Sequence, residues 1–420
     1  MIKLDVTLTF PDGQSIFCGV IYTTDPDSRG RIEGAFQYTQ DYLSHPRAFA
    51  LDPEHLPLGP HEIPTDRPQG VHGVFEDALP DNWGRELLSK KSGLPRHEQT
   101  VPRLLAVMGS SGLGALSFSS DRILPLKDVS AGMHELNTIV EAAMRYDAGL
   151  PVEDDDLGVL FSCGSSPGGA RPKALVKNKA GVQWIAKFPK LNDKYQVEAL
   201  EAGTLRLALA AGLDVPEFTI QNAGERQVFL IRRFDVTGQG GRNHMISLQT
   251  LLGADGYYHL SYSDIFNVIR KYSTEPKLDT EKLYRQMVFN VAIGNTDDHL
   301  KNFCMIQDEF GFGLSPAYDL LPDINENREH RLSFPQGAGT LSPGRSILAR
   351  IGSIYKVKDP EQVIDEVAEA VTDWRDVFWQ CGASPDDLQR LDKSIARRLD
   401  RLLPESHQAP GMGPTCSGLI

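Results

Sequence analysis

From residue 160 onward, strand-like segments come before helical segments, and this order constrains the fold more than any other feature of the chain. Short runs rich in β-branched and aromatic residues predict strands over 173–176, 183–188 and 228–233. Apolar residues at helical spacing predict helices over 197–211, 264–272, 280–293 and 360–379. Strands followed by helices, rather than alternating with them, indicate an α+β fold with a sheet lobe and a separate helical lobe.

The chain before residue 150 has the pattern of a separate unit. Alternating apolar residues over 2–10, the turn Pro11-Asp12-Gly13 and a second apolar run over 17–21 predict a β-hairpin. Residues 146–156 contain Gly, Pro and four consecutive acids, which is typical of a linker. We therefore expect a first domain over 1–150, a sheet lobe over 151–240, a helical lobe over 241–403 and a frayed tail over 404–420.

Composition excludes several classes of protein. The balance of 43 Lys and Arg against 56 Asp and Glu gives a net charge of −13, which argues against direct non-specific DNA binding. The five cysteines are scattered and form no Cys-x-x-Cys pair, so neither a zinc site nor a disulfide framework is indicated. No apolar run approaches the ~18–20 residues that span a bilayer. We expect a cytoplasmic protein that does not associate with membranes.

A polar loop follows the helix that is predicted to end near Gly294. It reads Asn295-Thr296-Asp297-Asp298-His299-Leu300-Lys301-Asn302-Phe303. Phosphoryl transfer to a hydroxyl needs a carboxylate to accept the proton, a cation near the γ-phosphate and an oxygen ligand for Mg²⁺. Asp297, Lys301 and Asn302 supply these in that order, with the Asp-x₄-Asn spacing of the protein-kinase catalytic loop. Thr296 replaces the arginine that usually precedes this Asp.

Two further residues fit the same chemistry. The stretch 303–314 predicts a short hairpin that would return Asp319 to the loop, where it would be the second oxygen ligand of Mg²⁺. Lys187 interrupts an apolar strand and needs a partner there, because a bare buried ammonium is costly. In kinases the partners are the nucleotide phosphates and a helix Glu. Glu198 and Glu201 are both within reach, and we favour Glu201.

The nucleotide would need a phosphate loop and a hinge. Gly168 and Gly169 lie in a glycine-rich segment whose backbone could approach phosphates, although it matches neither Gly-x-Gly-x-x-Gly nor a Walker A motif. The strand that includes Phe229 and Ile231 is the candidate hinge, which would hold adenine through backbone groups. A second glycine-rich run, 109–114, comes too early and is interpreted as a tight structural turn. His299 is interpreted as structural, and Trp83, Trp374 and Trp379 as core residues.

Together these motifs resemble the HipA family of serine/threonine kinase toxins. The resemblance rests on 295–303, on Ala317-Tyr318-Asp319-Leu320-Leu321-Pro322, on 168–173 and on the N-terminal signature over 75–85. It implies a two-lobed kinase-like fold, distantly related to phosphoinositide 3/4-kinases, with a sheet-rich N-terminal subdomain and an all-α C-terminal lobe. It also implies ATP- and Mg²⁺-dependent phosphorylation of a protein serine, with aminoacyl-tRNA synthetases as the family's targets.

The resemblance further implies regulation and a partner. Family members are silenced by autophosphorylation of a serine in the glycine-rich loop, here Ser165 or Ser166. The added negative charge would repel the bound nucleotide. A HipB-like helix-turn-helix antitoxin would supply the DNA contacts that this acidic chain lacks. Two alternatives stay open: a small-molecule or lipid phosphotransferase on the same scaffold, or a non-catalytic corepressor that acts with a DNA-binding partner.

Overall fold

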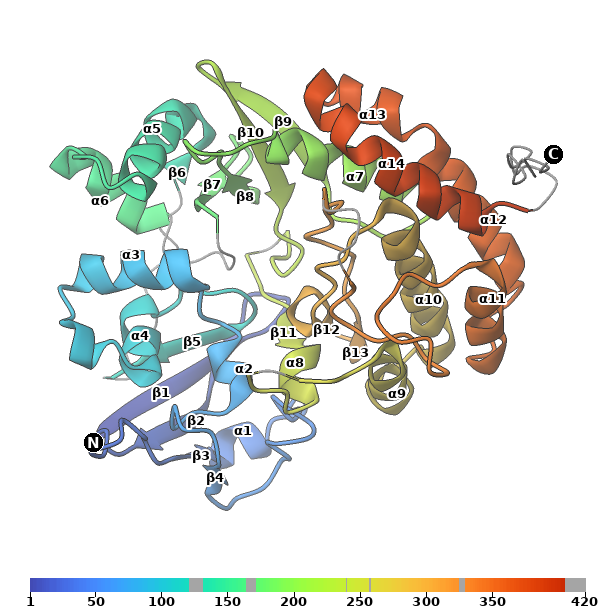
Figure 1. The fold of residues 1–420 in the computed structure, drawn as a ribbon. Coiled ribbons are helices and arrows are strands. Elements are labelled where there is room, and N and C mark those ends of the chain that lie inside the picture. Colours follow the sequence, from blue (N-terminus) through green and yellow to red (C-terminus); the bar gives the residue numbers. More distant parts are fainter. Residues whose placement is uncertain (121–130, 164–170, 239, 257, 325–328, 405–420) are drawn as a thin grey trace, which may run out of the picture.

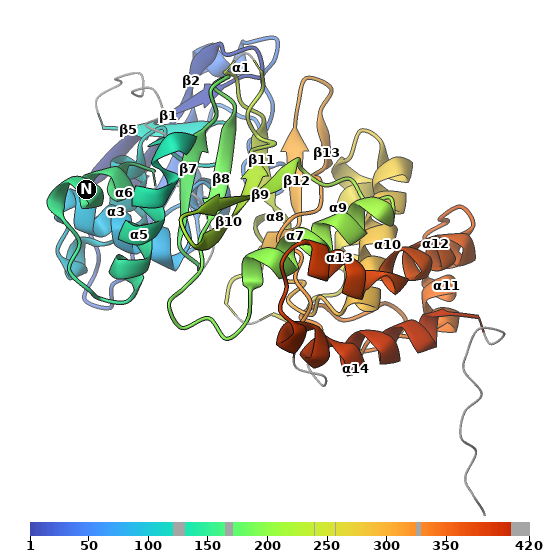
Figure 2. The ribbon, with the colours of Figure 1, turned by 90° about the horizontal axis from the view of Figure 1, so that it is seen from above.

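The computed structural model describes residues 1–120, 131–163, 171–238, 240–256, 258–324 and 329–404. The fold is a mixture of helices and strands in which three sheets follow one another along the chain. Figure 1 shows the first sheet and its helices on one side, the second sheet at the top, and the C-terminal helices on the other side. The view from above in Figure 2 places strands β7–β10 between these two sides.

The first sheet has the order β4-β3-β2-β1-β5 and is antiparallel throughout. Its strands are β1 Ile2–Thr9, β2 Ser15–Thr23, β3 Gly34–Tyr38, β4 Ile63–Thr65 and β5 Leu116–Ser119. The helices of this region are α1 Gln40–Leu43, α2 Gly73–Glu76, α3 Asn82–Ser92, the short η1 Arg96–Glu98 and α4 Val101–Met108. Pairing of Leu4 with Ile21 confirms the predicted hairpin.

The second sheet has the order β6-β7-β8-β10-β9. Its strands are β6 Ala131–Gly132, β7 Lys173–Lys177, β8 Gln183–Lys187, β9 Phe218–Ala223 and β10 Arg226–Arg232. The helices in this stretch are the short η2 Met133–Glu135, α5 Leu136–Asp147, α6 Asp154–Cys163 and α7 Val197–Ala210. Because β6 joins this sheet, the sheet begins before the predicted boundary at residue 150. The predicted linker is also shorter, since α5 and α6 leave only 148–153 between them.

The C-terminal region is mostly helical but not entirely so. Its helices are α8 Leu248–Leu251, α9 Tyr262–Tyr272, α10 Pro276–Ile293, η3 Leu300–Asn302, α11 Arg345–Ile354, α12 Pro360–Thr372, α13 Trp374–Gln380 and α14 Pro385–Leu402. A three-stranded sheet is built from β11 His244–Ser247, β12 Cys304–Gln307 and β13 Phe312–Leu314. The prediction of an all-α C-terminal lobe is therefore wrong, because β11 pairs with a strand about sixty residues further along the chain.

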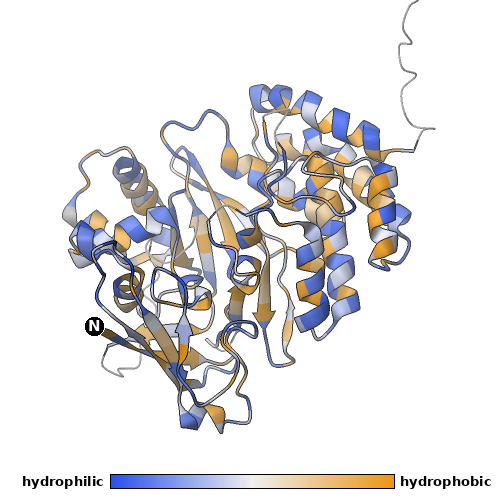
Figure 3. Cartoon of the chain, turned by 60° about the horizontal axis from the view of Figure 1, so that its bottom comes forward, coloured by the Kyte–Doolittle hydropathy of each residue, from blue (hydrophilic) through white to orange (hydrophobic). Residues whose placement is uncertain are grey.

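Buried apolar side chains form two clusters. The larger one runs from the first sheet into the C-terminal helices, and the smaller one packs α3, α5 and α6 against the second sheet. In Figure 3 the central strands are largely orange, whereas the outer helices mix blue and orange residues. Trp83 and Trp374 are buried, as predicted, but Trp379 is 57% exposed. Its prediction is wrong because the preceding residue, Phe378, takes the core-facing position of α13.

Among the described residues, no helix combines the length and apolarity that crossing a membrane requires.

Helix α7 packs very closely on α13 at Gly203. A Cβ added to Gly203 would lie 2.1 Å from a ring carbon of Phe378, well inside van der Waals contact. We expect Gly203→Ala to lower the free energy of unfolding by about 1–3 kcal/mol, because overpacking outweighs the better helix propensity of Ala. Urea unfolding followed by tryptophan fluorescence measures this change.

The matched control is Gly158 in α6, where an added Cβ meets nothing within 4 Å. Gly158→Ala should raise the free energy of unfolding by about 0.5–1 kcal/mol. Equal effects of the two substitutions would contradict the close packing of α7 on α13.

Candidate functional site

The polar loop starts where α10 ends. Gly294 adopts φ of +79°, which turns the chain out of the helix, and a Cβ there would lie 2.8 Å from Nε of Arg398. The Asn295 side-chain amide donates to Oδ1 of Asn290 at 3.1 Å. The Thr296 hydroxyl donates to Oδ2 of Asp323 at 2.9 Å. Since these side chains are buried, their hydrogen bonds fix the entry to the loop.

The buried side chain of Asp298 anchors the loop to the interior of the protein. This carboxylate accepts hydrogen bonds from the Tyr262 hydroxyl at 2.7 Å and the Arg331 backbone N–H at 2.8 Å. His330 Nδ1 lies 2.9 Å from the same carboxylate. Burial, together with the charge of Asp298, raises the pKa of Tyr262 well above its usual value. Asp298 was not among the predicted site residues, and only its position beside Asp297 could have drawn attention to it.

Asp297 points the other way. Its side chain is 56% exposed, and Nε of Arg331 lies 3.5 Å from its carboxylate. Asn302 is buried, and its amide donates to the Asp297 carbonyl at 2.9 Å. This contact places the side chain of Asn302 against the backbone of Asp297. The loop therefore presents one carboxylate to solvent and keeps the neighbouring one inside.

Lys187 joins three segments at the next part of the site. Its ammonium lies 2.5 Å from Glu201 in α7 and 2.8 Å from Asp319, which follows β13. Burial opposes the charge of Lys187, but the carboxylates of Asp319 and Glu201 outweigh it and raise its pKa. In return, Lys187 holds the pKa of Asp319 well below its usual range, against the effect of burial. Glu198 instead pairs with Arg171 at 3.0 Å, so the choice of Glu201 agrees with the contacts.

Asp319 has an unusual backbone. Its φ of +57° is in the left-handed region, which costs a non-glycine residue free energy and is often found at functional sites. Despite its contact with Lys187, the Asp319 side chain is 49% exposed, so one side of the carboxylate faces solvent. The neighbouring Tyr318 hydroxyl donates to the Lys301 carbonyl at 2.8 Å. Asp319 is therefore held next to the polar loop, as the predicted hairpin requires.

A second lysine faces the same place. Lys173 in β7 is the direct cross-strand partner of Lys187, so both side chains project from the same face of the sheet. Burial and the charge of Lys187 lower the pKa of Lys173 to about 8, although Asp319, Glu201 and Asp81 oppose this. Lys173 was not predicted as a site residue and appeared only as the last residue of the motif over 168–173. Its position could have indicated a role in the site, because it is the first residue of a strand and closely follows the glycine-rich run.

Lys301 does not point toward Lys187 but toward the N-terminal region. Its ammonium lies 3.3 Å from the carboxylate of Asp81, which directly precedes α3. Both side chains are about 40% exposed, at 45% for Lys301 and 39% for Asp81. The N-terminal region thus touches the loop that carries Asp297 and Asn302.

The remaining predicted residues divide into two groups. Ser165, Ser166, Gly168 and Gly169 lie outside the described residues. Phe229 and Ile231 are buried in the middle of β10, which pairs with β8 on one side and β9 on the other. Because the sheet occupies their backbone groups, the geometry does not support the adenine-binding role predicted for them. Beyond the strand, the ring of Phe234 lies 5.6 Å from that of Tyr318, beside the Asp319 segment.

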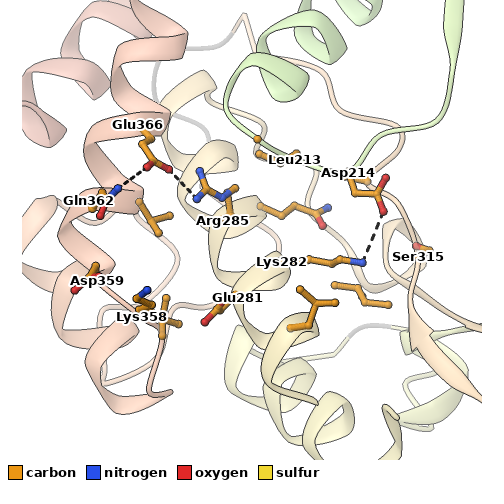
Figure 4. A pocket seen from close by; sticks show the side chains of 17 residues that line it. Leu213, Asp214, Glu281, Lys282, Arg285, Ser315, Lys358, Asp359, Gln362 and Glu366 are labelled. Atoms are coloured by element: carbon orange, nitrogen blue, oxygen red, sulfur yellow. Dashed lines mark hydrogen bonds and ion pairs between the residues drawn. The ribbon is translucent and has the colours of Figure 1, made fainter. Parts of the chain in front are cut away.

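A cavity of about 430 Å³ lies elsewhere, between α10, α12 and the loop after α7. Figure 4 shows its polar lining, in which Glu366 contacts Arg285 and Asp214 contacts Lys282. None of the site residues above lines this cavity. Both of these cations therefore already contact carboxylates.

Comparison with known families decides the classification. The model described as HipA-like C-terminal domain matches residues 165–375, and the HipA N-terminal domain matches residues 24–119. The chain belongs to the HipA family. Asp81 belongs to the region that matches the N-terminal domain and Lys301 to the region that matches the C-terminal domain, so their contact joins the two matched regions.

Several relatives have names that include the word kinase. "Putative kinase Y4mE" of Sinorhizobium fredii is 31% identical over 163 residues, which are 35% of this chain and 37% of that protein. "Putative kinase Y4dM" of the same organism is 27% identical, over 73% of this chain and 76% of that protein. The serine/threonine-protein kinase toxin HipA of Shewanella oneidensis is 23% identical, over 71% and 72%.

A solved complex of HipA, HipB and operator DNA from Shewanella oneidensis contains a chain of the same fold. The TM-score is 0.68 and the sequence identity 18%, and the match covers 95% of this chain and 96% of that chain. The likeness establishes the fold over almost the whole chain, including the N-terminal sheet.

The buried contact of Lys187 with Glu201 generates a stability prediction. Lys187→Met should lower the free energy of unfolding by about 3 kcal/mol, because it leaves the carboxylate of Glu201 buried without its cation. Adding Glu201→Met should recover most of that loss. Urea unfolding of the single and double variants measures both changes.

The control is Arg232→Met, which breaks an exposed ion pair of 3.2 Å with Glu217 on the same sheet. It should change the free energy of unfolding by less than about 0.5 kcal/mol. A loss no larger in Lys187→Met than in this control would contradict the buried pair.

Proposed function

We propose that this chain is an ATP- and Mg²⁺-dependent serine/threonine protein kinase of the toxin type. The observation that carries the proposal is the contact of Lys187 with Glu201 and Asp319, next to a loop that presents Asp297 and Asn302. A lysine held by a helix glutamate, with an aspartate at the end of a following hairpin, is the arrangement that protein kinases use around the phosphates of ATP.

Each residue has a chemical role in this proposal. Asp297 would orient the substrate hydroxyl and accept its proton, because its carboxylate is exposed. The side chain of Asn302 holds the backbone of the same residue in place through the Asp297 carbonyl. Lys301 would contact the γ-phosphate. Lys187 would contact the α- and β-phosphates and is already aligned by Glu201. Lys173 adds a second cation on the same face of the sheet.

The donor set suits Mg²⁺. Asp319 offers a half-exposed carboxylate, and the contact of Asn302 with Asp297 uses its N–H group and not its amide oxygen. Among the described residues, no group of three or more His, Cys, Asp or Glu side chains is arranged so that it could hold a metal ion. Such a cluster is not required, because Mg²⁺ commonly takes one or two protein oxygens together with phosphate oxygens and water. When bound there, it would offset the negative charge of the phosphates.

The proposal extends to regulation, partner and substrate. The solved relative is complexed with HipB and operator DNA, which supports a HipB-like helix-turn-helix partner for this chain. With a net charge of −13, this chain would contact DNA mainly through that partner. We propose a protein serine as the substrate, as in an aminoacyl-tRNA synthetase. Autophosphorylation of Ser165 or Ser166 would silence the enzyme by placing negative charge beside the nucleotide.

Phosphate transfer from radiolabelled ATP tests the proposed function. With Mg²⁺ present, the wild-type chain should label itself or a protein from a cell extract. Asp297→Ala should reduce labelling by at least about a hundredfold, because it removes the group that accepts the proton. Asp319→Asn should give a similar loss because it weakens the metal site.

The control is Asp376→Ala, at an exposed aspartate in the first turn of α13, far from the loop in the sequence. It should label as the wild type does. Equal labelling by the wild type and Asp297→Ala would refute the role of Asp297, and faster phosphorylation of a small metabolite would favour a different substrate class.

The lowered pKa of Lys173 generates a pH prediction. Below about pH 8 its ammonium is charged and attracts phosphates, and it loses its proton as the pH rises. The dissociation constant for ATP should therefore increase by up to about tenfold between pH 7 and 9. A fluorescent ATP analogue measures the affinity across this range.

Lys173→Met should bind more weakly at pH 7 and lose this pH dependence. The matched control is Lys179→Met, which changes an exposed lysine in the turn after the same strand. This variant should keep the pH dependence of ATP binding. The same slope in Lys173→Met and wild type would exclude Lys173 from the phosphate site.

A further inference from the structure

Asp81 is at a position where an aspartate usually has another function. It is the N-cap residue of α3, and Asp is favoured there because its side chain accepts a backbone N–H of the first turn. No such cap bond is formed here. The carboxylate instead lies 3.3 Å from the ammonium of Lys301, which is 220 residues away along the chain. An N-cap contact worth about 1 kcal/mol is thus replaced by a long-range ion pair.

The segment that carries Asp81 is braced on both sides. Asp77, four residues earlier, accepts hydrogen bonds from the Ser247 backbone at 2.8 Å and the Ser247 hydroxyl at 2.9 Å. Ser247 ends β11, the strand that pairs with β12 directly after the polar loop. On the other side, Nε of Arg85 donates to the Pro80 carbonyl at 2.8 Å. Asp81 is therefore held in place over the loop by its neighbours and does not depend on Lys301 for its position.

Lys301 is less well placed without Asp81. Its backbone is fixed by the Tyr318 hydroxyl at 2.8 Å, but its side chain is 45% exposed and has four rotatable bonds. Immobilising such a side chain costs up to about 2 kcal/mol of rotamer entropy. An ammonium has three donors, so a bond to Asp81 leaves two for a phosphate.

We propose that Asp81 is a positioning residue of the active site, through which the N-terminal domain holds Lys301 in place for the transferred phosphate. The inference rests on the proposed function, since it assumes that Lys301 contacts the γ-phosphate. It makes the N-terminal domain a part of the catalytic unit, contributing one carboxylate to the mechanism.

A plain docking contact between the two regions is the competing explanation, and the chain contains a matched example of one. Lys271 in α9 lies 2.5 Å from Glu54 of the N-terminal region. The two side chains are 58% and 33% exposed, close to the values for Lys301 and Asp81. Glu54→Gln therefore removes a similar ion pair across the same two regions, at a site without the candidate catalytic residues.

The test is a double-mutant cycle on steady-state phosphotransfer with the full chain. Asp81→Asn should lower kcat about three- to tenfold and change KM for ATP less than twofold, because Lys301 would act on the phosphoryl group during its transfer and not on the binding of the nucleotide. In the Lys301→Met background, Asp81→Asn should have no further effect. Asp81→Glu should restore part of the loss, and Glu54→Gln should change neither constant.

Asn caps helices as well as Asp does, so Asp81→Asn should leave α3 and the thermal midpoint unchanged. If the effects of Asp81→Asn and Lys301→Met multiply, or if Glu54→Gln lowers kcat as much, this inference is overturned while the proposed function stands. If the wild-type chain transfers no phosphate from ATP, the proposed function fails and this inference fails with it.

Discussion

The position of one ammonium group determines the geometry of the site. Lys187 comes from β8 and Glu201 from α7, the next element along the chain, whereas Asp319 follows β13 and is 132 residues from Lys187. A buried lysine is tolerated only if its charge is compensated. Compensation by two carboxylates from different elements therefore fixes how the second sheet, α7 and the third sheet lie relative to one another. The same requirement selects Glu201 and leaves Glu198 to Arg171.

The loop after α10 shows how two adjacent aspartates acquire opposite roles. Asp298 is enclosed by Tyr262, His330 and the Arg331 backbone, whereas Asp297 is 56% exposed. A carboxylate that accepts several hydrogen bonds in the interior anchors the backbone but is not accessible to a substrate. The exposed carboxylate gains a defined position because its neighbour is immobile. The buried network thus provides the rigidity on which an exposed reactive group depends.

What the sequence predicted were relationships within short stretches of chain. The hairpin at 303–314, the loop spacing from Asp297 to Asn302 and the strand around Lys187 all depend on residues close in sequence, and the structure contains each of them. Asp298 and Asp81 were missed as site residues because their roles come from partners 32 and 220 residues away, and Lys173 because its role depends on the strand register that places it opposite Lys187. The geometry does not support adenine binding by Phe229 and Ile231 for a related reason. A strand can be predicted from a short stretch of sequence, but whether other strands pair with both of its edges cannot.

Helix α14 completes the support of this loop. Its Arg398 packs against Gly294, where the loop starts, and donates to Ser342, while Asp387 at its other end accepts from the backbone of Gln196 just before α7. The residues that brace the loop are therefore synthesised about ninety positions after the loop itself. On the ribosome, a nascent chain that already contains every candidate catalytic residue still lacks this brace. The order of synthesis thus delays the completed site until almost all of the described chain has been made.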